Sequence, residues 1–438
     1  PATATATPMF EEDERVSGAT AYLERDEDGC VYAVADSGAQ QEDVWIKLHQ
    51  GQRTDIGART DRQLKQIITS SQGLFHTQFP SGRVMTRCDT VERELVVEDP
   101  TTHRTWRSTF GYSSEGAHLM GVAVAPGSTV CGGTAFPMRF FRYDPVEDEW
   151  TNRACHGQWN TVAPQGDHFF VGGYTGGFLL EWDPAAPWVA TDPAASQTNP
   201  RFLIQTAPAI NRPHALLAHE NGRDVVLAGG PGYGLTGGGV LFWDRATETG
   251  VLREHTDLIE HHAVMSLVPL EGRRILAGTT VAPGTGGERL ADLATLVELD
   301  LDSKEITWHA PALDGVSEYT DLAVAAGGLI YGIADRSRFF VFDPVARVIL
   351  KEHATEEQFG LTAYHQGPRL FIRDPDSGEM YLLFQKGIAR ISGGPDYKIE
   401  LLSEAPIPIQ CGGDLLNGRI YFGSGSHLYS CNIAGVEA

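Results

Sequence analysis

The chain has 438 residues, and 34 lysines and arginines against 57 aspartates and glutamates give it a net charge of −23. Nucleic-acid binding needs concentrated basic charge to neutralise phosphates, so this balance argues against a nucleic-acid-binding protein. A composition that is 42% hydrophobic and 21% charged is ordinary for a globular chain. No apolar run approaches the roughly 18 residues of a membrane helix. We therefore expect a globular protein that neither binds nucleic acid nor spans a membrane.

The first 112 residues combine strand-like runs with one helical pattern. The runs at 30–36, 43–48 and 94–100 are rich in β-branched and aromatic residues, which favour strands. Leu64, Ile67 and Ile68 have helical spacing, and they predict a short helix over 59–72. Residues 1–8 lack the basic and apolar regions of a signal peptide. A start rich in Thr, Ala and Pro fits the processed end of a secreted protein, which we favour, or an arbitrary cloning boundary, and the localisation stays open.

Residues 113–438 repeat one pattern of strands. Apolar strands end in an aspartate followed by a turn, as in FFRYDP at 140–145, LLEWDP at 179–184 and VLFWDR at 240–245. This aspartate stands at positions 99, 144, 183, 244, 300 and 343, at intervals of 39 to 61 residues. Such intervals match one four-stranded sheet plus its loops, which is the repeat of a β-propeller. We expect the aspartate to accept hydrogen bonds within the turn.

The repeat predicts an all-β fold, a β-propeller of about seven four-stranded blades within a single propeller domain. Innermost strands are expected near residues 118, 159, 214, 263, 319, 369 and 408. The strands of 1–112 would then supply the outer strand that closes the ring, which removes exposed sheet edges. An eighth blade built from those strands is the alternative.

Loops at one mouth of a propeller bring together side chains from many blades, so equivalent positions of successive repeats are candidate site residues. Starts of innermost strands provide His118, Asn160, Arg212, His214, His262 and Tyr319. Ends of second strands provide Arg139, Tyr174 and Tyr233. Trp159 and Trp188, at a strand start and in a long loop, are candidate platforms for stacking a sugar.

This set is rich in His, Tyr and Arg and poor in carboxylates, unlike the paired acids of a glycosidase. A β-elimination reaction at a uronic acid residue fits these residue types better than glycoside hydrolysis does. An arginine neutralises the sugar carboxylate, while imidazole and phenol groups remove and donate protons.

The repeat and its His, Tyr and Arg residues resemble the seven-bladed propeller polysaccharide lyases, the ulvan and rhamnosyl-glucuronate lyases. The resemblance implies β-elimination with a His pair, a Tyr and an Arg at one mouth. His118 matches the first histidine of the pair, whereas the second position holds Met138. We therefore assign catalysis to His118, His214, Tyr233 and Arg212, with Arg139 as a second carboxylate clamp.

The predicted function is thus a lyase acting on an acidic oligosaccharide or polysaccharide. Two alternatives stay open: a rhamnosidase-like propeller hydrolase, and a non-catalytic propeller that binds a glycan or a protein. A metal-dependent lactonase fits less well, since only Asn160, Asp321 and Asp414 would supply its ligands. We expect a monomer without a cofactor or catalytic metal, and a structural divalent metal is left open.

Overall fold

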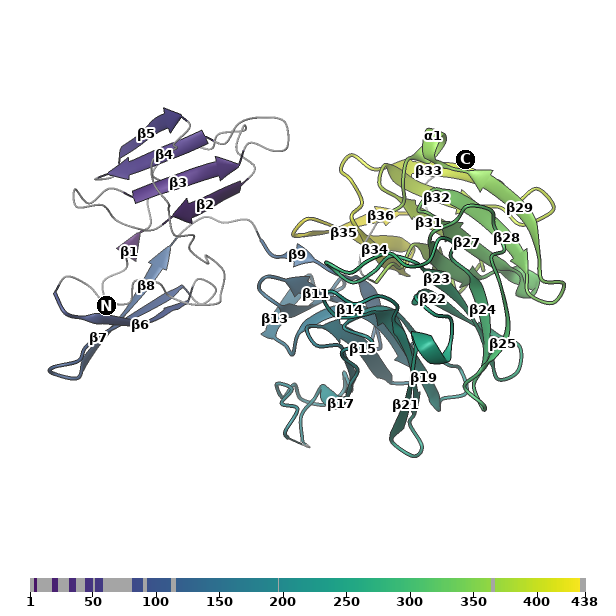
Figure 1. The fold of residues 1–438 in the computed structure, drawn as a ribbon, viewed down its shortest axis with the longest axis horizontal. Helices are drawn as coiled ribbons and strands as arrows, with labels where there is room; N and C mark the ends of the chain where they lie inside the picture. The colour runs from purple at the N-terminus through teal and green to yellow at the C-terminus, as the bar shows by residue number, and fades with distance from the viewer. Residues whose placement is uncertain are drawn as a thin grey trace. The chain divides into compact units, whose positions relative to one another are not determined.

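The computed structural model describes residues 4–5, 18–22, 31–36, 44–49, 52–57, 81–89, 93–111, 116–195, 197–363 and 367–433. The chain divides into two compact units, Pro1–Ser114 and Glu115–Ala438. In Figure 1 the first unit runs from purple to blue and the second from blue to yellow.

The first unit contains two sheets. One is antiparallel and consists of β2 (Gly18–Tyr22), β3 (Val31–Asp36), β4 (Val44–His49) and β5 (Gln52–Gly57). The other consists of β6 (Val84–Asp89), β7 (Glu94–Asp99) and β8 (Arg104–Gly111), with β1 (Ala4–Thr5) parallel to β8. The runs at 30–36, 43–48 and 94–100 are therefore strands, as predicted. The helix predicted over 59–72 lies outside the described residues, and the ring-closing role of 1–112 stays a prediction.

The second unit consists of seven antiparallel sheets in chain order, which we call blades 1 to 7. Blade 1 contains β9 (His118–Leu119), β10 (Ala123–Ala125), β11 (Thr129–Ala135), β12 (Arg139–Asp144) and β13 (Glu149–Ala154). Blade 2 contains β14 (Gln158–Gln165), β15 (His168–Tyr174), β16 (Phe178–Trp182) and β17 (Arg201–Gln205). Blade 3 contains β18 (Arg212–Ala218), β19 (Asp224–Gly230), β20 (Gly239–Asp244) and β21 (Thr249–Glu254).

Blade 4 contains β22 (Ala263–Leu270), β23 (Arg274–Thr280), β24 (Leu296–Asp300) and β25 (Ile306–Ala310). Blade 5 contains β26 (Tyr319–Val324), β27 (Ile330–Ala334), β28 (Arg338–Asp343) and β29 (Val348–Ala354). Blade 6 contains β30 (Phe371–Arg373), β31 (Met380–Phe384), β32 (Gly387–Ile391) and β33 (Ile399–Glu404), and blade 7 contains β34 (Cys411–Leu416), β35 (Arg419–Ser424) and β36 (His427–Asn432). The helices described are single turns: η1 (His255–Asp257), η2 (Ala326–Gly328) and α1 (Glu356–Phe359).

The all-β propeller prediction is therefore confirmed, with seven blades in this unit. Each predicted innermost strand lies within three residues of the start of an observed one. Blade 7 has three strands among the described residues rather than the expected four. The hydrophobic core lies between neighbouring blades, as where Phe170 and Leu179 of blade 2 pack against Leu227 and Trp243 of blade 3.

The aspartate repeated along the sequence has the predicted role. Its side chain accepts hydrogen bonds from backbone amides two or three residues further on, so it fixes the turn between the third and fourth strands. Asp300, for example, accepts from the amides of Asp302 at 3.0 Å and Ser303 at 2.7 Å. The same turn occurs at Asp99, Asp144, Asp183, Asp244 and Asp343.

Innermost strands of neighbouring blades are held together by polar side chains beside a β-bulge. The register between first and second strands shifts in blades 2, 3, 4, 5 and 7. A bulge re-aims a side chain, and here it turns one toward the next blade. Ser266 Oγ donates to the Tyr319 carbonyl at 3.0 Å, and Asp321 accepts from the Leu370 amide at 2.7 Å.

Asp414 joins the last blade to the first. Its Oδ2 atom accepts from the Val124 amide and from Arg369 Nη2, both at 2.9 Å. The Leu119 amide also donates to the Gly425 carbonyl at 2.9 Å. The yellow strands of blade 7 accordingly lie beside the blue strands of blade 1 (Figure 1). The ring of innermost strands is therefore closed by contacts within the second unit.

Replacing Asp414 with alanine should weaken this closure. The variant leaves the Val124 amide and the Arg369 guanidinium without their acceptor, which should lower the free energy of unfolding by about 2 kcal/mol. Hydrogen exchange at Val124 should also become faster. The Asp302→Ala variant, which removes an exposed partner of Arg273, is the control and should change stability by less than about 1 kcal/mol. Equal stability of the two variants would contradict the role of Asp414.

Candidate functional site

A cavity of about 570 Å³ lies where blades 1, 2 and 3 meet, at the edge where innermost strands begin and second strands end. We call it the mouth cavity. Its main lining residues are His118, Met120, Phe136, Gln158, Tyr174, Arg212 and Tyr233. Four of the residues predicted from equivalent positions in the repeat, His118, Tyr174, Arg212 and Tyr233, thus line one cavity although up to 115 positions of sequence separate them, 118 to 233.

Arg212 and two tyrosines form the wall contributed by blades 2 and 3. The hydroxyl oxygens of Tyr174 and Tyr233 are 2.5 Å apart. The guanidinium carbon of Arg212 lies 4.9 Å from the ring centroid of Tyr233 and 5.5 Å from that of Tyr174. At these distances the cation is attracted to the faces of both rings. The wall is therefore a single unit of two phenols and one guanidinium.

The loops around this wall are fixed by their own hydrogen bonds. Arg212 Nη1 donates to Thr285 Oγ1 at 2.5 Å, and the Gly234 amide donates to the Thr285 carbonyl at 2.9 Å. The loop after Tyr174 needs glycine, because a Cβ at Gly177 would lie 1.6 Å from the Ile210 carbonyl oxygen and its φ is +53°. Tyr174 and Tyr233 are thus held in place before any ligand binds.

The two phenols differ in pKa. The hydrogen bond from Tyr174, followed by Arg212, lowers the pKa of Tyr233. Burial, followed by the hydrogen bond to Tyr233, raises the pKa of Tyr174. These directions fit Tyr174 as the donor and Tyr233 as the acceptor. Whichever phenol donates, the other keeps its own O–H group as a hydrogen-bond donor.

The two histidines assigned to proton transfer lie in different cavities. His118 is exposed at the start of β9 and lines the mouth cavity. His214 lines a second cavity of about 190 Å³, enclosed by innermost strands, which we call the channel cavity. The β-bulge between Pro213 and Ala215 puts His214 on this inner side. The expected histidine pair is therefore not assembled.

Of the two tryptophans proposed as sugar platforms, Trp159 belongs to the core and the partly buried Trp188 packs against it, which corrects that prediction. Trp159 is 1% exposed, and its ring centroid lies 4.8 Å from that of Phe140. Trp188 stacks on the same Phe140 ring at 4.8 Å with an interplanar angle of 19°. Since Trp182 joins this group as well, the aromatic rings of blades 1 and 2 cover one another and present no flat face to a sugar.

Tyr319 and Asn160 are also buried rather than available to a ligand. Tyr319 is fully buried, accepts from the Leu313 amide at 3.1 Å, and has its pKa raised to about 12 by burial. Asn160 accepts from Gln158 Nε2 at 2.6 Å and donates to the Pro213 carbonyl at 3.5 Å. Both residues therefore connect parts of the framework.

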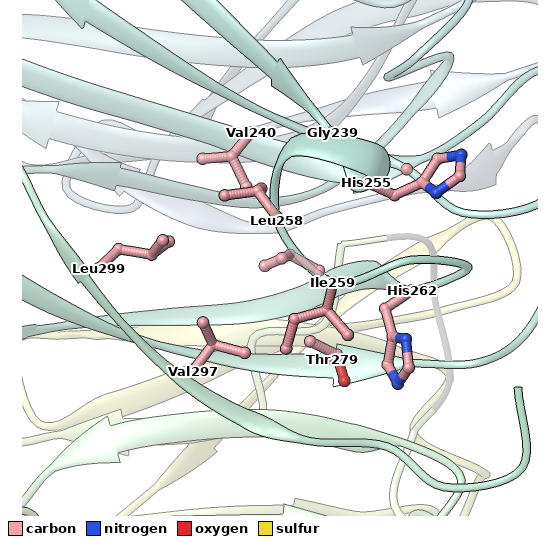
Figure 2. A pocket seen from close by; sticks show the side chains of 11 residues that line it. Gly239, Val240, His255, Leu258, Ile259, His262, Thr279, Val297 and Leu299 are labelled. Atoms are coloured by element: carbon pink, nitrogen blue, oxygen red, sulfur yellow. The ribbon is translucent and has the colours of Figure 1, made fainter. Parts of the chain in front are cut away.

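Arg139 and His262 lie outside the mouth cavity. Arg139 Nε donates to Asn152 Oδ1 of the outer strand β13 at 2.5 Å, so Arg139 bonds within blade 1, and its role as a carboxylate clamp stays a prediction. His262 borders a separate apolar pocket of about 20 Å³ with Leu258 and Ile259 (Figure 2). Its ring nitrogens lie 2.8 Å from the Glu260 carbonyl and 2.9 Å from the Leu293 carbonyl. This pocket has room for no more than one water molecule.

Arg369, which the sequence did not single out, spans the channel cavity. It comes from the segment before β30 of blade 6, donates to the Val162 carbonyl of blade 2 at 2.9 Å, and pairs with Asp414 of blade 7. Asp321 of blade 5 lines the same cavity. Burial raises the pKa of Asp321 to about 6, against the opposing effects of the Leu370, Phe371 and Leu322 amides and of Arg369.

Within the described ranges, no group of three or more His, Cys, Asp or Glu residues is arranged to hold a metal ion. None of the helices that the structure describes is long and apolar enough to span a membrane.

No protein-family model matches the chain, and a search of curated proteins finds no match. The chain is similar in structure to the β-propeller domain of Cps50 (Swd1) from Myceliophteria thermophila, with a TM-score of 0.51 and 11% identity over 74% of this chain and 98% of that one. It is also similar to the WD40 β-propeller domain of Doa1, with a TM-score of 0.50 and 13% identity over 73% of this chain and 93% of that one. At such identities the likeness shows the fold.

These comparisons support the propeller part of the expected resemblance and not its lyase part. Both similar structures are β-propeller domains and neither is a polysaccharide lyase, so the comparisons point away from the predicted enzyme and correct that prediction. The separation of His118 from His214 agrees with this correction.

Asp321 should make stability depend on pH. Its folded-state pKa of about 6 is above the ordinary value of 3.8, so the folded protein binds a proton more tightly than the unfolded chain. The stabilisation that comes from this tighter proton binding is present below about pH 4 and is lost as the pH rises through about 6. We expect a loss of about 1–2 kcal/mol in the free energy of unfolding, because the cavity partly hydrates the carboxylate. Urea unfolding at about pH 4.5, 6 and 8 measures this loss of stability.

The Asp321→Asn variant keeps an oxygen acceptor for the Leu370 amide but cannot ionise. Its stability should therefore change less over the same pH range than that of the wild-type protein. Identical pH profiles of the two proteins would contradict a raised pKa at Asp321.

Proposed function

We propose that this propeller is a non-catalytic binding module that holds a segment of another protein in the mouth cavity. The observation that carries the proposal is the convergence of Tyr174, Arg212 and Tyr233 with the exposed Phe136 in one cavity of about 570 Å³. Tyrosine, phenylalanine and arginine are enriched at protein interfaces, and tyrosine and arginine often dominate their binding energy. A cavity of this size accepts a few side chains.

Exposure supports the same conclusion. Phe136 is 75% exposed and Tyr233 is 61% exposed, although both are large rings that gain from burial. They belong to blades 1 and 3 and line the same cavity. A bound segment lying between them would cover both rings and remove apolar surface from water.

The experiment is a screen of a randomised peptide library, followed by affinity measurements by fluorescence anisotropy. The Phe136→Ala and Tyr233→Ala variants should each bind the selected peptides about tenfold more weakly, since each loses the burial of one ring. Val345→Ser alters a residue that is 88% exposed in the turn between β28 and β29, and this control should bind normally.

Failure of any peptide to bind would contradict the proposal. Equal binding by all three variants would also contradict it, because the peptides would then bind elsewhere. Selective retention of a glycan in place of peptides would instead assign the mouth cavity to carbohydrate.

A further inference from the structure

The mouth cavity differs in charge from the rest of the protein. The chain carries a net charge of −23, yet the described residues that line the cavity include Arg212 and His118 and no aspartate or glutamate. An acidic ligand is repelled by most of this chain and attracted to a place where a guanidinium faces a cavity. On the basis of the proposed function, we infer that the segment bound in the mouth cavity is acidic and that Arg212 receives its carboxylate.

Arg212 is prepared for this contact. Thr285 holds one terminal nitrogen at 2.5 Å, and the rings of Tyr174 and Tyr233 flank the guanidinium. Arginine presents a planar fork of N–H groups that matches a carboxylate. Because the side chain is already held, binding costs less rotamer entropy than ordering a mobile arginine would.

The two phenols add a neutral donor beside the cation. Tyr174 and Tyr233 share one hydrogen bond between their hydroxyls, so whichever phenol donates, the other keeps an O–H group as a donor toward a ligand near Arg212. The guanidinium lies over both rings, and its charge opposes a second cation in the same place. The wall is therefore suited to an anion and unsuited to a lysine or methylated lysine side chain.

The wall contributed by blade 1 includes apolar side chains. Phe136 and Met120 of blade 1 line the same cavity as the Arg212 wall of blades 2 and 3. A ligand that satisfies both walls has a carboxylate next to a bulky apolar side chain. This is a more specific requirement than negative charge, since a highly charged chain without an apolar residue would leave Phe136 uncovered.

The test uses pools of fluorescent peptides of about nine residues, roughly 30 Å when extended, with randomised leucine-rich flanks and a fixed central residue. The central residue is Glu, Gln or Lys, and each pool is made with an amidated and with a free C-terminus. The Glu pool should bind about tenfold or more tightly than the Gln pool, and the Lys pool should bind most weakly. A preference for the free C-terminus would assign the carboxylate to the chain end and not to a side chain.

Arg212→Gln should abolish the preference for Glu over Gln, and Arg212→Lys should keep part of it, because lysine retains the charge without the fork. Arg139→Gln is the matched control, since Arg139 pairs with Asn152 outside the cavity, and it should keep the full preference. Thermal unfolding of each variant checks that the fold is intact. Raising NaCl from about 50 mM to about 500 mM should weaken the Glu pool more than the Gln pool.

Different results would contradict the acidic ligand and the proposed binding function. Equal binding of the Glu and Gln pools, with both weakened by Phe136→Ala, would overturn the acidic ligand and leave the binding module standing. A Glu preference that survives in Arg212→Gln would overturn the assignment to Arg212. Absence of binding by every pool would overturn the binding module as well.

Discussion

The bonds between innermost strands of neighbouring blades are the constraint on which the site depends. Each blade is a separate sheet, so only these bonds and the packing between blades fix one sheet against the next. Asn160 bonds to the Pro213 carbonyl across blades 2 and 3, and Asp414 closes the ring between blades 7 and 1. Tyr174 and Tyr233 can meet at 2.5 Å only because blades 2 and 3 are held in this way.

Charged side chains have two kinds of surroundings in this protein: paired residues on the blades, and Arg212 at the mouth cavity. Many described arginines are paired with carboxylates on the blades, as Arg273 is with Asp224 and Asp302. Such pairs fix neighbouring strands and leave little charge for a ligand. Arg212 lines the mouth cavity and bonds to a hydroxyl and to aromatic faces instead, and no carboxylate among the described residues pairs with it.

The fold could be predicted from the sequence because its repeating signal is local. Asp300 and its counterparts bond to amides two or three residues away, so the turn appears in the sequence as a motif. Arg212 and Tyr233 were found because equivalent positions of a repeat converge at one edge. Trp159 and His214 were misassigned because strand alternation and a bulge decide which way they face. Arg369 was missed because its partner Val162 is 207 positions away.

The central claim, that side chains of three blades form one binding mouth, is tested most directly by hydrogen–deuterium exchange of the whole chain with a tightly bound acidic peptide. The account predicts slower exchange in three segments far apart in sequence, 116–120, 172–177 and 229–238, and unchanged exchange in the outer strands of blades 4 to 6. Slower exchange limited to the outer strands, or to a single blade, would contradict it.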